Sequence, residues 1–582
     1  MAKKIVFNQD AREKIRKGVK TLANQYKSII KTYLDDSNWE NQENSNNSRG
    51  YPSMFNLIAG SVIRDYTLDE HYAGDIATAH KEGWMHIHDL KSGLVAYCCG
   101  HSLQSLLKQG FKGADRSAAA PAKHLDSMLA QAANFIGTLQ TEWAGAQAFN
   151  GIDTFAAPFI RHHFDKDLGR YRSLGYHEVK QAIQRFVFML NIATRWGESP
   201  FSNITMDLTP YGDIANMDVI HGGVHKEEFG TYADYQKEMD VFNKALLEVM
   251  AEGDASGRIF TFPIITYNIT EDFDWDSEIA DAIIEVTAKY GLPYFNNYVS
   301  TGLSLNDTRS FCCRLSLDLR ALAKKTGGTF GAGDLTGSVG VVTLNLVMLA
   351  AAADGNPAKF IQVLNKYLGL AAESLIIKRR IILHSLDSGI LPYTKMYLPD
   401  KYDNHFSTIG VVGGHEACLA MFGEGIDSEG GTVWIKSVLN HIRAFLLQQQ
   451  ELTGNLWNLE ATPAEGASYR LALCTQKKFP DAKLAGTVEV PYLTNSTNLP
   501  VSFTSQLWKA IAHQAKIQPL YTGGTIFHVF LGESPDKQAC KKLVRKIVET
   551  TKLSYFSITP TFSVCPIHGY MTGKHWTCPL CI

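Results

Sequence analysis

The chain carries two pairs of adjacent cysteines, Cys98-Cys99 and Cys312-Cys313, more than two hundred residues apart. A disulfide needs Cα atoms about 4.4 to 6.8 Å apart and unstrained side chains, so neighbouring cysteines do not easily bond to each other. Each sulfur is therefore expected to find a partner elsewhere, and each pair could supply the other's. The pattern suggests thiol redox or radical chemistry, although inert packing is the commoner role of any single buried cysteine.

A second group of candidate residues lies at the C-terminus. Cys565 and His568 are separated by two residues, and Cys578 and Cys581 repeat that spacing nine residues later. Two such chelating pairs are typical of a tetrahedral zinc site, and four protein ligands would leave no position for a catalytic water. We therefore expect a structural zinc, with His575 as the main competitor to His568 for the fourth position.

His86 and His88 could also suggest a metal pair. Their i, i+2 spacing in an apolar run instead favours structural hydrogen bonds beside a strand.

Bulk composition excludes several classes of protein. The 582 residues include 56 Lys and Arg against 58 Asp and Glu, for a net charge of -2. This balance disfavours binding to polymeric nucleic acid or to an anionic membrane surface. No apolar run reaches 18 residues, and Met1-Ala2-Lys3-Lys4 leads into a charged segment rather than a signal-peptide core. Ten cysteines are too few for a secreted disulfide scaffold, so we expect a cytoplasmic protein without a membrane span.

The elements that must position these residues read as alternating strands and helices. Residues 94–97, 204–208, 260–269 and 340–346 resemble strands, whereas 118–149 and 279–289 resemble helices. Alternating strand and helix units indicate an α/β fold with a parallel sheet. Residues 1–32 read as a separate N-terminal extension with a short strand and a basic helix.

Several motifs together resemble anaerobic, class III ribonucleoside-triphosphate reductases in sequence and order. The likeness runs from about Tyr33 to Ile582 and includes the C-terminal zinc motif. The other motifs are His86-Ile87-His88-Asp89-Leu90, Tyr97-Cys98-Cys99-Gly100, Cys312-Cys313-Arg314-Leu315, Thr462-Pro463-Ala464-Glu465-Gly466 and Tyr492-Leu493-Thr494-Asn495-Ser496. The resemblance implies a ten-stranded α/β barrel of two five-stranded parallel halves, with Cys312-Cys313 on a central finger loop. It also implies a catalytic barrel over residues 33–555 and a small zinc-binding module over 556–582.

The family implies reduction of ribonucleoside triphosphates by a cysteine thiyl radical. The Cys-Arg step favours Cys313 as the thiyl residue, with Cys312 as the alternative. Cys98 resembles the cysteine on the first barrel strand, which delivers hydrogen to the 2′ face of the sugar and ends as a disulfide or a sulfur-centred radical. Glu460 is the candidate base for the 3′-hydroxyl, unless formate enters as the reductant; a solvated or salt-bridged carboxylate is the alternative.

Ser338 stands where formate-dependent members of the family have Asn, and those members also differ at Glu460. Both departures, and the second finger-loop cysteine, favour a thioredoxin-like reductant over formate.

For the substrate's triphosphate we expect backbone amides and hydroxyls, because the net charge leaves no large excess of cations. Tight turns are the alternative interpretation of the loops concerned. The candidate residues are Thr494, Asn495, Ser496, Gly523, Gly524 and Thr525.

Family members also carry a glycyl radical on a loop beyond the zinc site, whereas this sequence ends one residue past Cys581. Truncation, or a loop supplied by a separate small polypeptide, would account for this. The expected partners are ATP or deoxynucleotide effectors, a radical S-adenosylmethionine activating enzyme and a second copy of the chain. The alternatives are another glycyl radical enzyme of the pyruvate formate-lyase type, and a catalytically silent nucleotide-binding protein.

Overall fold

The computed structural model describes most of the chain from residue 48 onward. The described residues are 13, 17, 24, 26–35, 48–72, 74–113, 117–193, 197–302, 308–310, 316–318, 335–462, 465–501, 503, 506–565, 567 and 569–581. The expected N-terminal strand and the Cys312-Cys313 segment lie outside these residues. Two short strands, β13 (Thr308–Ser310) and β14 (Ser316–Asp318), pair antiparallel on either side of that segment in sequence.

One mixed sheet organises the described chain, and its main path contains ten strands. Five neighbours are mutually parallel: β2 (Cys98–His101), β5 (Gln147–Phe149), β8 (Ser202–Met206), β11 (Ile264–Ile269) and β12 (Tyr294–Asn297). The other five run in the opposite direction: β15 (Thr336–Asn345), β16 (His405–Val412), β17 (Leu456–Glu460), β20 (Phe527–Phe530) and β21 (Tyr555–Thr559). The two groups meet antiparallel at β2–β15 and at β12–β21.

Hydrogen bonds just before β20 join the two ends of this path. The amides of Thr522 and Gly523 donate to the carbonyl of Leu459 at 3.1 and 2.7 Å, and the amide of Ala461 donates to Gly524 O at 2.7 Å. The sheet therefore closes on itself, which confirms the expected ten-stranded α/β barrel of two five-stranded halves. A further strand, β1 (Met85–Ile87), pairs antiparallel with the C-terminal part of β15.

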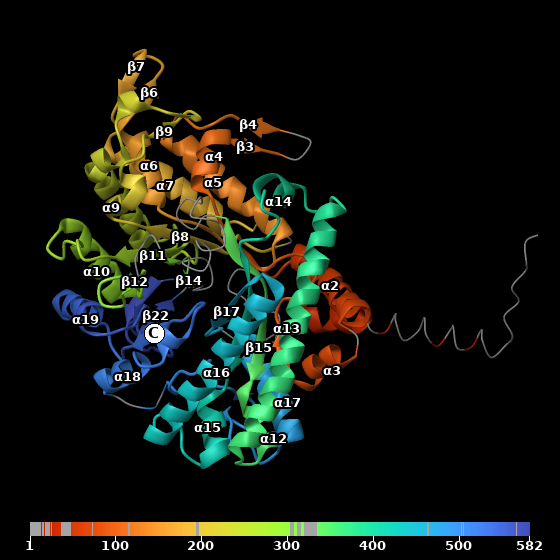
Figure 1. Cartoon of the computed structure of the whole chain (residues 1–582). Helices are drawn as coiled ribbons and strands as arrows, with labels where there is room; N and C mark the ends of the chain where they lie inside the picture. Colours follow the sequence, from red (N-terminus) through yellow and green to blue (C-terminus); the bar gives the residue numbers. More distant parts are fainter. Residues whose placement is uncertain are drawn as a thin grey trace, which may run out of the picture.

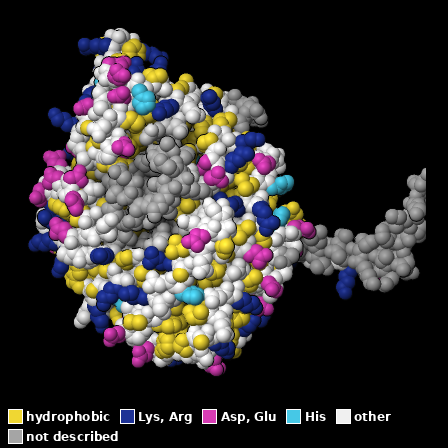
Figure 2. All heavy atoms as spheres, in the orientation of Figure 1, with side chains coloured by type: hydrophobic (Ala, Val, Ile, Leu, Met, Phe, Trp, Pro, Cys, Tyr) yellow, Lys and Arg dark blue, Asp and Glu magenta, His cyan; other side chains and the backbone are white. Residues whose placement is uncertain are grey.

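Helices cover the outside of both halves (Figure 1). The first half packs mainly against α5 (Leu125–Leu139), α6 (Ile152–Arg161), α7 (Tyr176–Asn191), α9 (Gln236–Glu252), α10 (Glu278–Tyr290) and α19 (Lys537–Thr550). The second half packs against α3 (Asp75–Glu82), α12 (Leu346–Ala353), α13 (Pro357–Asp387), α15 (Gly414–Phe422) and α16 (Glu429–Thr453). Each helical layer and the strands under it together form one of the two large apolar clusters. Figure 2 shows basic and acidic side chains interspersed on the visible face, in keeping with the balanced net charge.

The strands alternate between an apolar outer face and a more polar inner face, as side chains with a period of two must. On β11, Ile265, Tyr267 and Ile269 belong to the outer apolar cluster. The intervening Thr266 lies on the other face and its hydroxyl bonds Tyr555 Oη at 2.7 Å. The inner face also carries Asn203, Thr205, Asn268, Asn296, Ser338, Thr408, Asn458 and Ser557, all almost fully buried. Such a lining suits a polar ligand rather than a sealed hydrocarbon core.

Helix α13 is long and apolar enough, by composition, to cross a membrane. Its residues Phe360, Leu364, Leu368 and Ile382 are completely buried within the apolar clusters beside the sheet. This packing identifies α13 as a core helix of the barrel.

Several expected element boundaries are wrong. The run at 94–97 is not a strand; β2 begins at Cys98, so the cysteine pair starts the strand instead of ending it. The helix expected over 118–149 is α5 alone, followed by a short turn and then β5. The domain boundary expected at residue 555 falls in β21, which belongs to the large sheet, and only the hairpin β22 (Phe562–Cys565) and β23 (Gly569–Thr572) follows it.

Buried histidines should make the fold sensitive to acid. His101 faces outward from β2 and its Nε2 lies 2.6 Å from Gln147 Oε1. Burial lowers the pKa of His101 to about 4, although the bond to Gln147 acts in the opposite direction. An unfolded histidine has a pKa of about 6.5. Between pH 6.5 and 4 the unfolded chain therefore binds more protons, so stability is lost as the pH falls through this window.

We expect the His101→Gln variant to lose less stability than the unaltered protein between pH 7 and pH 4.5, by about 2 kcal/mol. Urea unfolding at the two pH values measures this difference. His441→Gln is the control, because His441 is half-buried on α16 and its Nε2 lies 2.7 Å from Asn365 Oδ1 at the surface. An equal loss in the His101→Gln variant and the unaltered protein would show that His101 does not contribute.

Candidate active site

Cys98 points into the barrel, and its neighbour Cys99 points out of it. Cys98 is completely buried and packs against Ala146, Ala148, Phe406 and Leu456, which come from β5, β16 and β17 and the residues beside them. Cys99 belongs to the outer cluster between the sheet and its helices. The alternation of β2 therefore selects Cys98 as the thiol that can act inside the barrel.

Ser338 lies directly opposite Cys98 in the antiparallel β2–β15 pair. Its Oγ is 2.8 Å from Thr408 Oγ1 and donates to the carbonyls of Gly340 and Phe406 at 3.1 and 3.3 Å. These bonds tie β15 to β16 where their register shifts. Ser338 thus fixes the wall of the barrel next to the Cys98 sulfur.

Glu460 lies on the same inner face, at the end of β17, and is 2% exposed. It pairs with Gly410 of β16, which pairs with Thr343 of β15. Thr343 is five residues beyond Ser338, about 16 Å along the strand. The structure therefore places Glu460 and Cys98 in one barrel but at different depths along these strands.

Asn458 was not singled out from the sequence. It precedes Glu460 by two residues on β17 and so shares its inward face. Both amide atoms of Asn458 are buried and form no hydrogen bond with any described residue. Buried amides are normally paired, so an unpaired one inside a polar barrel is a candidate ligand contact. The sequence Leu456-Trp457-Asn458-Leu459-Glu460 could have predicted this, because residues two apart on a strand face the same side.

The Thr494-Asn495-Ser496 loop lies across the ends of β16 and β17. Its carbonyls accept hydrogen bonds from Gly413 and Gly414, which begin α15, at 2.9 Å. Both the amide and the hydroxyl of Thr494 donate to the Glu416 carboxylate. The hydroxyl of Ser496 bonds Tyr521 Oη at 2.7 Å. Thr494 and Ser496 thus hold the loop in place, and Asn495 Oδ1 is left buried without a described partner.

Helix α17 (Glu465–Lys478) begins beside this loop. Ser468 Oγ donates to Leu493 O at 2.7 Å and accepts from the Leu493 amide at 2.9 Å. The N-termini of α15 and α17 therefore converge with the loop beyond the ends of their strands. Helix N-termini carry unpaired N–H groups and a partial positive charge, which suit a phosphate.

The Gly523-Gly524-Thr525 segment closes the barrel. The Gly523 amide is used in the bond to Leu459, and a Cβ on Gly523 would lie 3.0 Å from that carbonyl oxygen. Within the described part of the chain, the amides of Gly524 and Thr525 donate no hydrogen bond. Only the second part of this segment therefore offers donors for a ligand.

Three cysteines of the C-terminal motif converge. The sulfurs of Cys565, Cys578 and Cys581 lie within 4.8 Å of one another, and those of Cys565 and Cys581 are 3.6 Å apart. The Ile567 amide donates to the Cys565 sulfur at 3.4 Å, which helps a thiolate carry its charge. His568 lies outside the described residues. The three sulfurs fit the ligand set of a thiophilic metal ion such as zinc.

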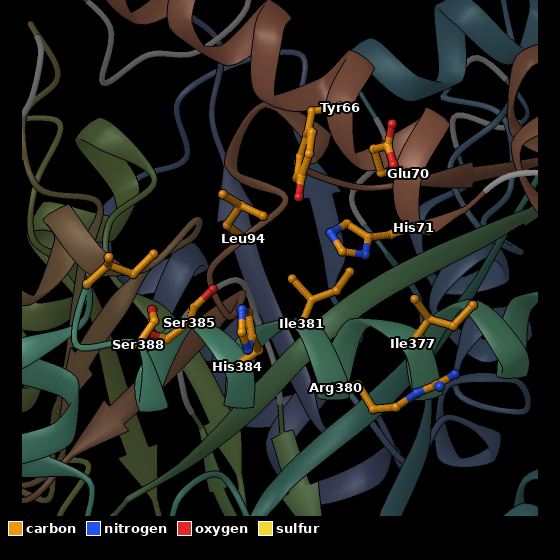
Figure 3. A pocket seen from close by; sticks show the side chains of 11 residues that line it. Tyr66, Glu70, His71, Leu94, Ile377, Arg380, Ile381, His384, Ser385 and Ser388 are labelled. Carbon is orange, nitrogen blue, oxygen red and sulfur yellow. The ribbon is translucent and has the colours of Figure 1, made fainter. Parts of the chain in front are cut away.

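A pocket of about 510 Å³ lies outside the barrel, between α2 (Tyr51–Tyr66) with the following turn and α13. Figure 3 shows Tyr66 and His71 approaching it from one side and His384 from α13 on the other. None of the predicted site residues lines it. This pocket is therefore separate from the inner face of the barrel, toward which Cys98 points.

Comparisons with known proteins agree with this architecture. A family model described as anaerobic ribonucleoside-triphosphate reductase matches residues 43–582. Anaerobic ribonucleoside-triphosphate reductases of Salmonella typhimurium and Escherichia coli are 25% and 24% identical, covering 93% of this chain and 77% of each relative. The enzyme of Enterobacteria phage T4 is 24% identical over 93% of this chain and 90% of its own.

The anaerobic ribonucleotide reductase of Thermotoga maritima, solved with dATP and CTP, superimposes with a TM-score of 0.74 at 20% identity, covering 100% of this chain and 96% of the other. A second structure of that enzyme has dATP bound in the specificity site and gives a TM-score of 0.73 at 20% identity, with the same coverage. The fold is thus shared along the full length of the chain. With the family model spanning nearly all of the sequence, the chain belongs to the anaerobic ribonucleoside-triphosphate reductases, oxidoreductases that catalyse ribonucleotide reduction.

Proposed function

We propose that this chain reduces ribonucleoside triphosphates to 2′-deoxyribonucleoside triphosphates inside the barrel, with Cys98 as the reducing thiol. One observation supports this proposal most: both cysteines are buried, but only Cys98 lies on the inner face, beside Ser338. A thiyl radical on Cys313, with Cys312 as the alternative, takes the hydrogen atom from C3′ and later returns it. A glycyl radical, when present, supplies the unpaired electron for that cysteine.

The electron balance of this proposal needs two thiols. Cys98 donates a proton to the 2′-hydroxyl, which leaves as water, and the second hydrogen of the two thiols takes its place on C2′, so that two electrons and two protons pass from the thiols to the sugar. Cys98 and the finger-loop cysteine that does not carry the radical then form a disulfide. A thioredoxin-like protein reduces this disulfide by exchange, which restores both thiols.

For Glu460 we propose the role of base for the 3′-hydroxyl proton. Its burial on the inner face supports this role, because a base must reach the sugar from the barrel wall. The neighbouring Asn458, with its unpaired amide, is proposed to hydrogen-bond the nucleotide. The convergent loop at Asn495 and the amides of Gly524 and Thr525 are proposed to contact the phosphates.

The reductant provides the test of this function. Protein supplied with a glycyl radical loop, in the same chain or as a separate polypeptide, and then activated anaerobically should convert CTP to dCTP with reduced thioredoxin, consuming one dithiol per nucleotide. Formate should not replace thioredoxin. Release of CO₂ from formate, with no use of thioredoxin, would assign the other reductant. Protein that carries an activated glycyl radical and binds CTP, but forms no dCTP with either reductant, would contradict the reductase function.

Partners and location are part of the same proposal. We propose a homodimer, ATP or deoxynucleotide effectors and a radical S-adenosylmethionine activating enzyme. A row of exposed apolar side chains on α2, namely Tyr51, Phe55, Val62 and Tyr66, supports an interface with a second copy. Sedimentation should then give twice the chain mass of 64.5 kDa. The free thiols of Cys418 and Cys540 suit the reducing cytosol.

We also propose that Cys565, Cys578 and Cys581, with His568, hold one structural zinc per chain. Cys578→Ser, or treatment with a chelator, should remove the metal and open the residues that follow β21 to protease while the barrel stays folded. Metal analysis and limited proteolysis measure the two effects. Cys474→Ser is the control, since Cys474 lies on α17 away from the cluster. Less than half an equivalent of zinc in reduced, freshly purified protein would refute the assignment.

A further inference from the structure

Thr462 follows β17 and carries a buried hydroxyl whose hydrogen is not used. The residue is 1% exposed and lies two positions beyond Glu460. Thr462 Oγ1 accepts a hydrogen bond from Thr343 Oγ1 at 3.2 Å, and among the residues that the structure describes it donates to none. Buried donors are normally paired, so this hydrogen is free for a group that approaches it from inside the barrel.

Gly410 of β16 makes room for this hydroxyl between Thr343 and Glu460. It pairs with Thr343 on one side and with Glu460 on the other. A Cβ on Gly410 would overlap Thr462 Oγ1 and would lie 2.9 Å from Thr343 Oγ1, so the Thr462 hydroxyl fills the space of the missing side chain. Neighbouring strands are about 4.8 Å apart. The unused hydrogen is therefore about one strand spacing from the Glu460 side chain.

Thr343 and His88 continue this chain of hydrogen bonds away from Glu460. The Thr343 hydroxyl has one hydrogen and donates it to Thr462. The 2.8 Å bond between Thr343 Oγ1 and His88 Nε2 must therefore use the imidazole N–H, so His88 carries a proton on Nε2. Every donor in the chain from His88 through Thr343 to Thr462 then points toward Glu460. Hydrogen bonds in such a chain polarise one another, which makes the last hydroxyl a stronger donor.

The groups around His88 keep its imidazole neutral. The ring of His86 is 4.7 Å from that of His88, and the ring of His80, from α3, is 5.3 Å from that of His86. Arg470 of α17 donates through its Nε to His86 Nδ1 at 3.1 Å. Burial, and after it the charge of Arg470, lowers the pKa of His88 to about 4. At pH 7 His88 is therefore a neutral hydrogen-bond donor at the start of the chain.

We propose that, with a nucleotide bound, Thr462 donates its hydrogen to the Glu460 carboxylate, and that Thr343 and His88 orient Thr462 for this bond. The inference rests on the proposed function, because it takes Glu460 as the base for the 3′-hydroxyl. Hydrogen bonds at catalytic groups often shorten only in the complex with substrate. A bond to the ionised form favours that form, so Glu460 stays a carboxylate despite its burial. Thr462, Thr343 and His88 are thus positioning residues that act through Glu460.

Nucleotide binding tests the proposal without any radical. An ionised Glu460 should make CTP bind roughly 10- to 100-fold more tightly than 3′-deoxycytidine triphosphate, because only CTP offers the 3′-hydroxyl. Calorimetry at a series of pH values gives the pH at which half of this preference is lost, which reports the protonation of Glu460. That midpoint should rise by about one pH unit in Thr462→Val and by about half a unit in Thr343→Val, since a bond to a charged group changes a protonation constant roughly tenfold.

Thr462→Ser and Thr343→Ser are the matched controls, because serine keeps the hydroxyl and should leave the midpoint in place. An unchanged midpoint in both valine variants, or an equal rise in the serine controls, would overturn the proposal. If the valine variants do not fold, nitrogen NMR of labelled histidines in the unaltered protein decides: His88 should carry its proton on Nε2, and a proton on Nδ1 alone would overturn the proposal.

Glu460→Gln separates this inference from the proposed function. It should reduce the preference for CTP to less than about threefold and remove its dependence on pH. If Glu460→Gln loses the preference while both valine variants keep the original midpoint, only the chain of positioning residues is wrong. If Glu460→Gln keeps the full preference, the base role of Glu460 is contradicted, and this inference falls with it.

Discussion

Replacing Cys98 with Ser should abolish nucleotide reduction and leave nucleotide binding unchanged. Serine keeps the size and the buried position of the side chain, but its hydroxyl can neither supply an electron nor form a disulfide. Turnover should therefore fall to less than about a thousandth of the original rate, as when a residue at the centre of a mechanism is removed. Assays of dCTP formation by the activated protein and of CTP binding by calorimetry measure the two properties separately.

Cys99→Ser is the matched control, because Cys99 is the adjacent residue on the same strand and is equally buried. Its side chain faces the outer apolar cluster, so this variant should keep most of its activity and lose only some stability. If Cys99→Ser is inactive and Cys98→Ser is active, the assignment of the inner face to the chemistry is wrong. In the other doublet, full activity of Cys313→Ser with loss of activity in Cys312→Ser would reverse the choice of thiyl residue.

The fold could be predicted because its strongest signals are spread along the whole chain. The alternating strand and helix segments, together with the ordered motifs, indicated the two-part barrel that the described strands form. Local boundaries were harder to predict. The apolar run at 94–97 looked like a strand, but Tyr97 and its neighbours form the turn that leads into β2. A residue belongs to a strand because it pairs with a residue of a neighbouring strand. The residue that pairs with Cys98 is Ser338, 240 residues away.

The site was predicted less completely, for the same reason. Cys98 and Glu460 could be named from motifs, but their different depths depend on the register of β15, β16 and β17. Thr494 was predicted to contact the substrate, and nothing in the sequence indicated that its amide and hydroxyl donate to Glu416, 78 residues away. His86 was expected to make structural hydrogen bonds, and one of its bonds is to Arg470, 384 residues away. No spacing in the sequence brings such pairs together.

The close approach of β2 and β15 leads to the second large expected effect, in the Gly337→Ala variant. A Cβ on Gly337 would lie 2.0 Å from Cys98 O, 2.8 Å from Cys98 C and 2.9 Å from Cys99 Cα. All three atoms are backbone, so no side chain can rotate away and the two strands must separate. Overpacking usually costs about 1 to 3 kcal/mol, and we expect the upper end or more here because the backbone must move. Since the displaced segment carries Cys98, turnover should fall as well.

Gly369→Ala is the control for this variant, since Gly369 lies in the middle of α13 and a Cβ there meets nothing within 4 Å. Alanine is the better helix former, so this substitution should stabilise the protein by up to about 1 kcal/mol. Urea unfolding of both variants, with dCTP formation as the second measurement, separates the steric effect from the general effect of replacing glycine. If Gly337→Ala unfolds at the same urea concentration as the unaltered protein, β2 and β15 do not approach as closely as described, and Cys98 is not held by this contact.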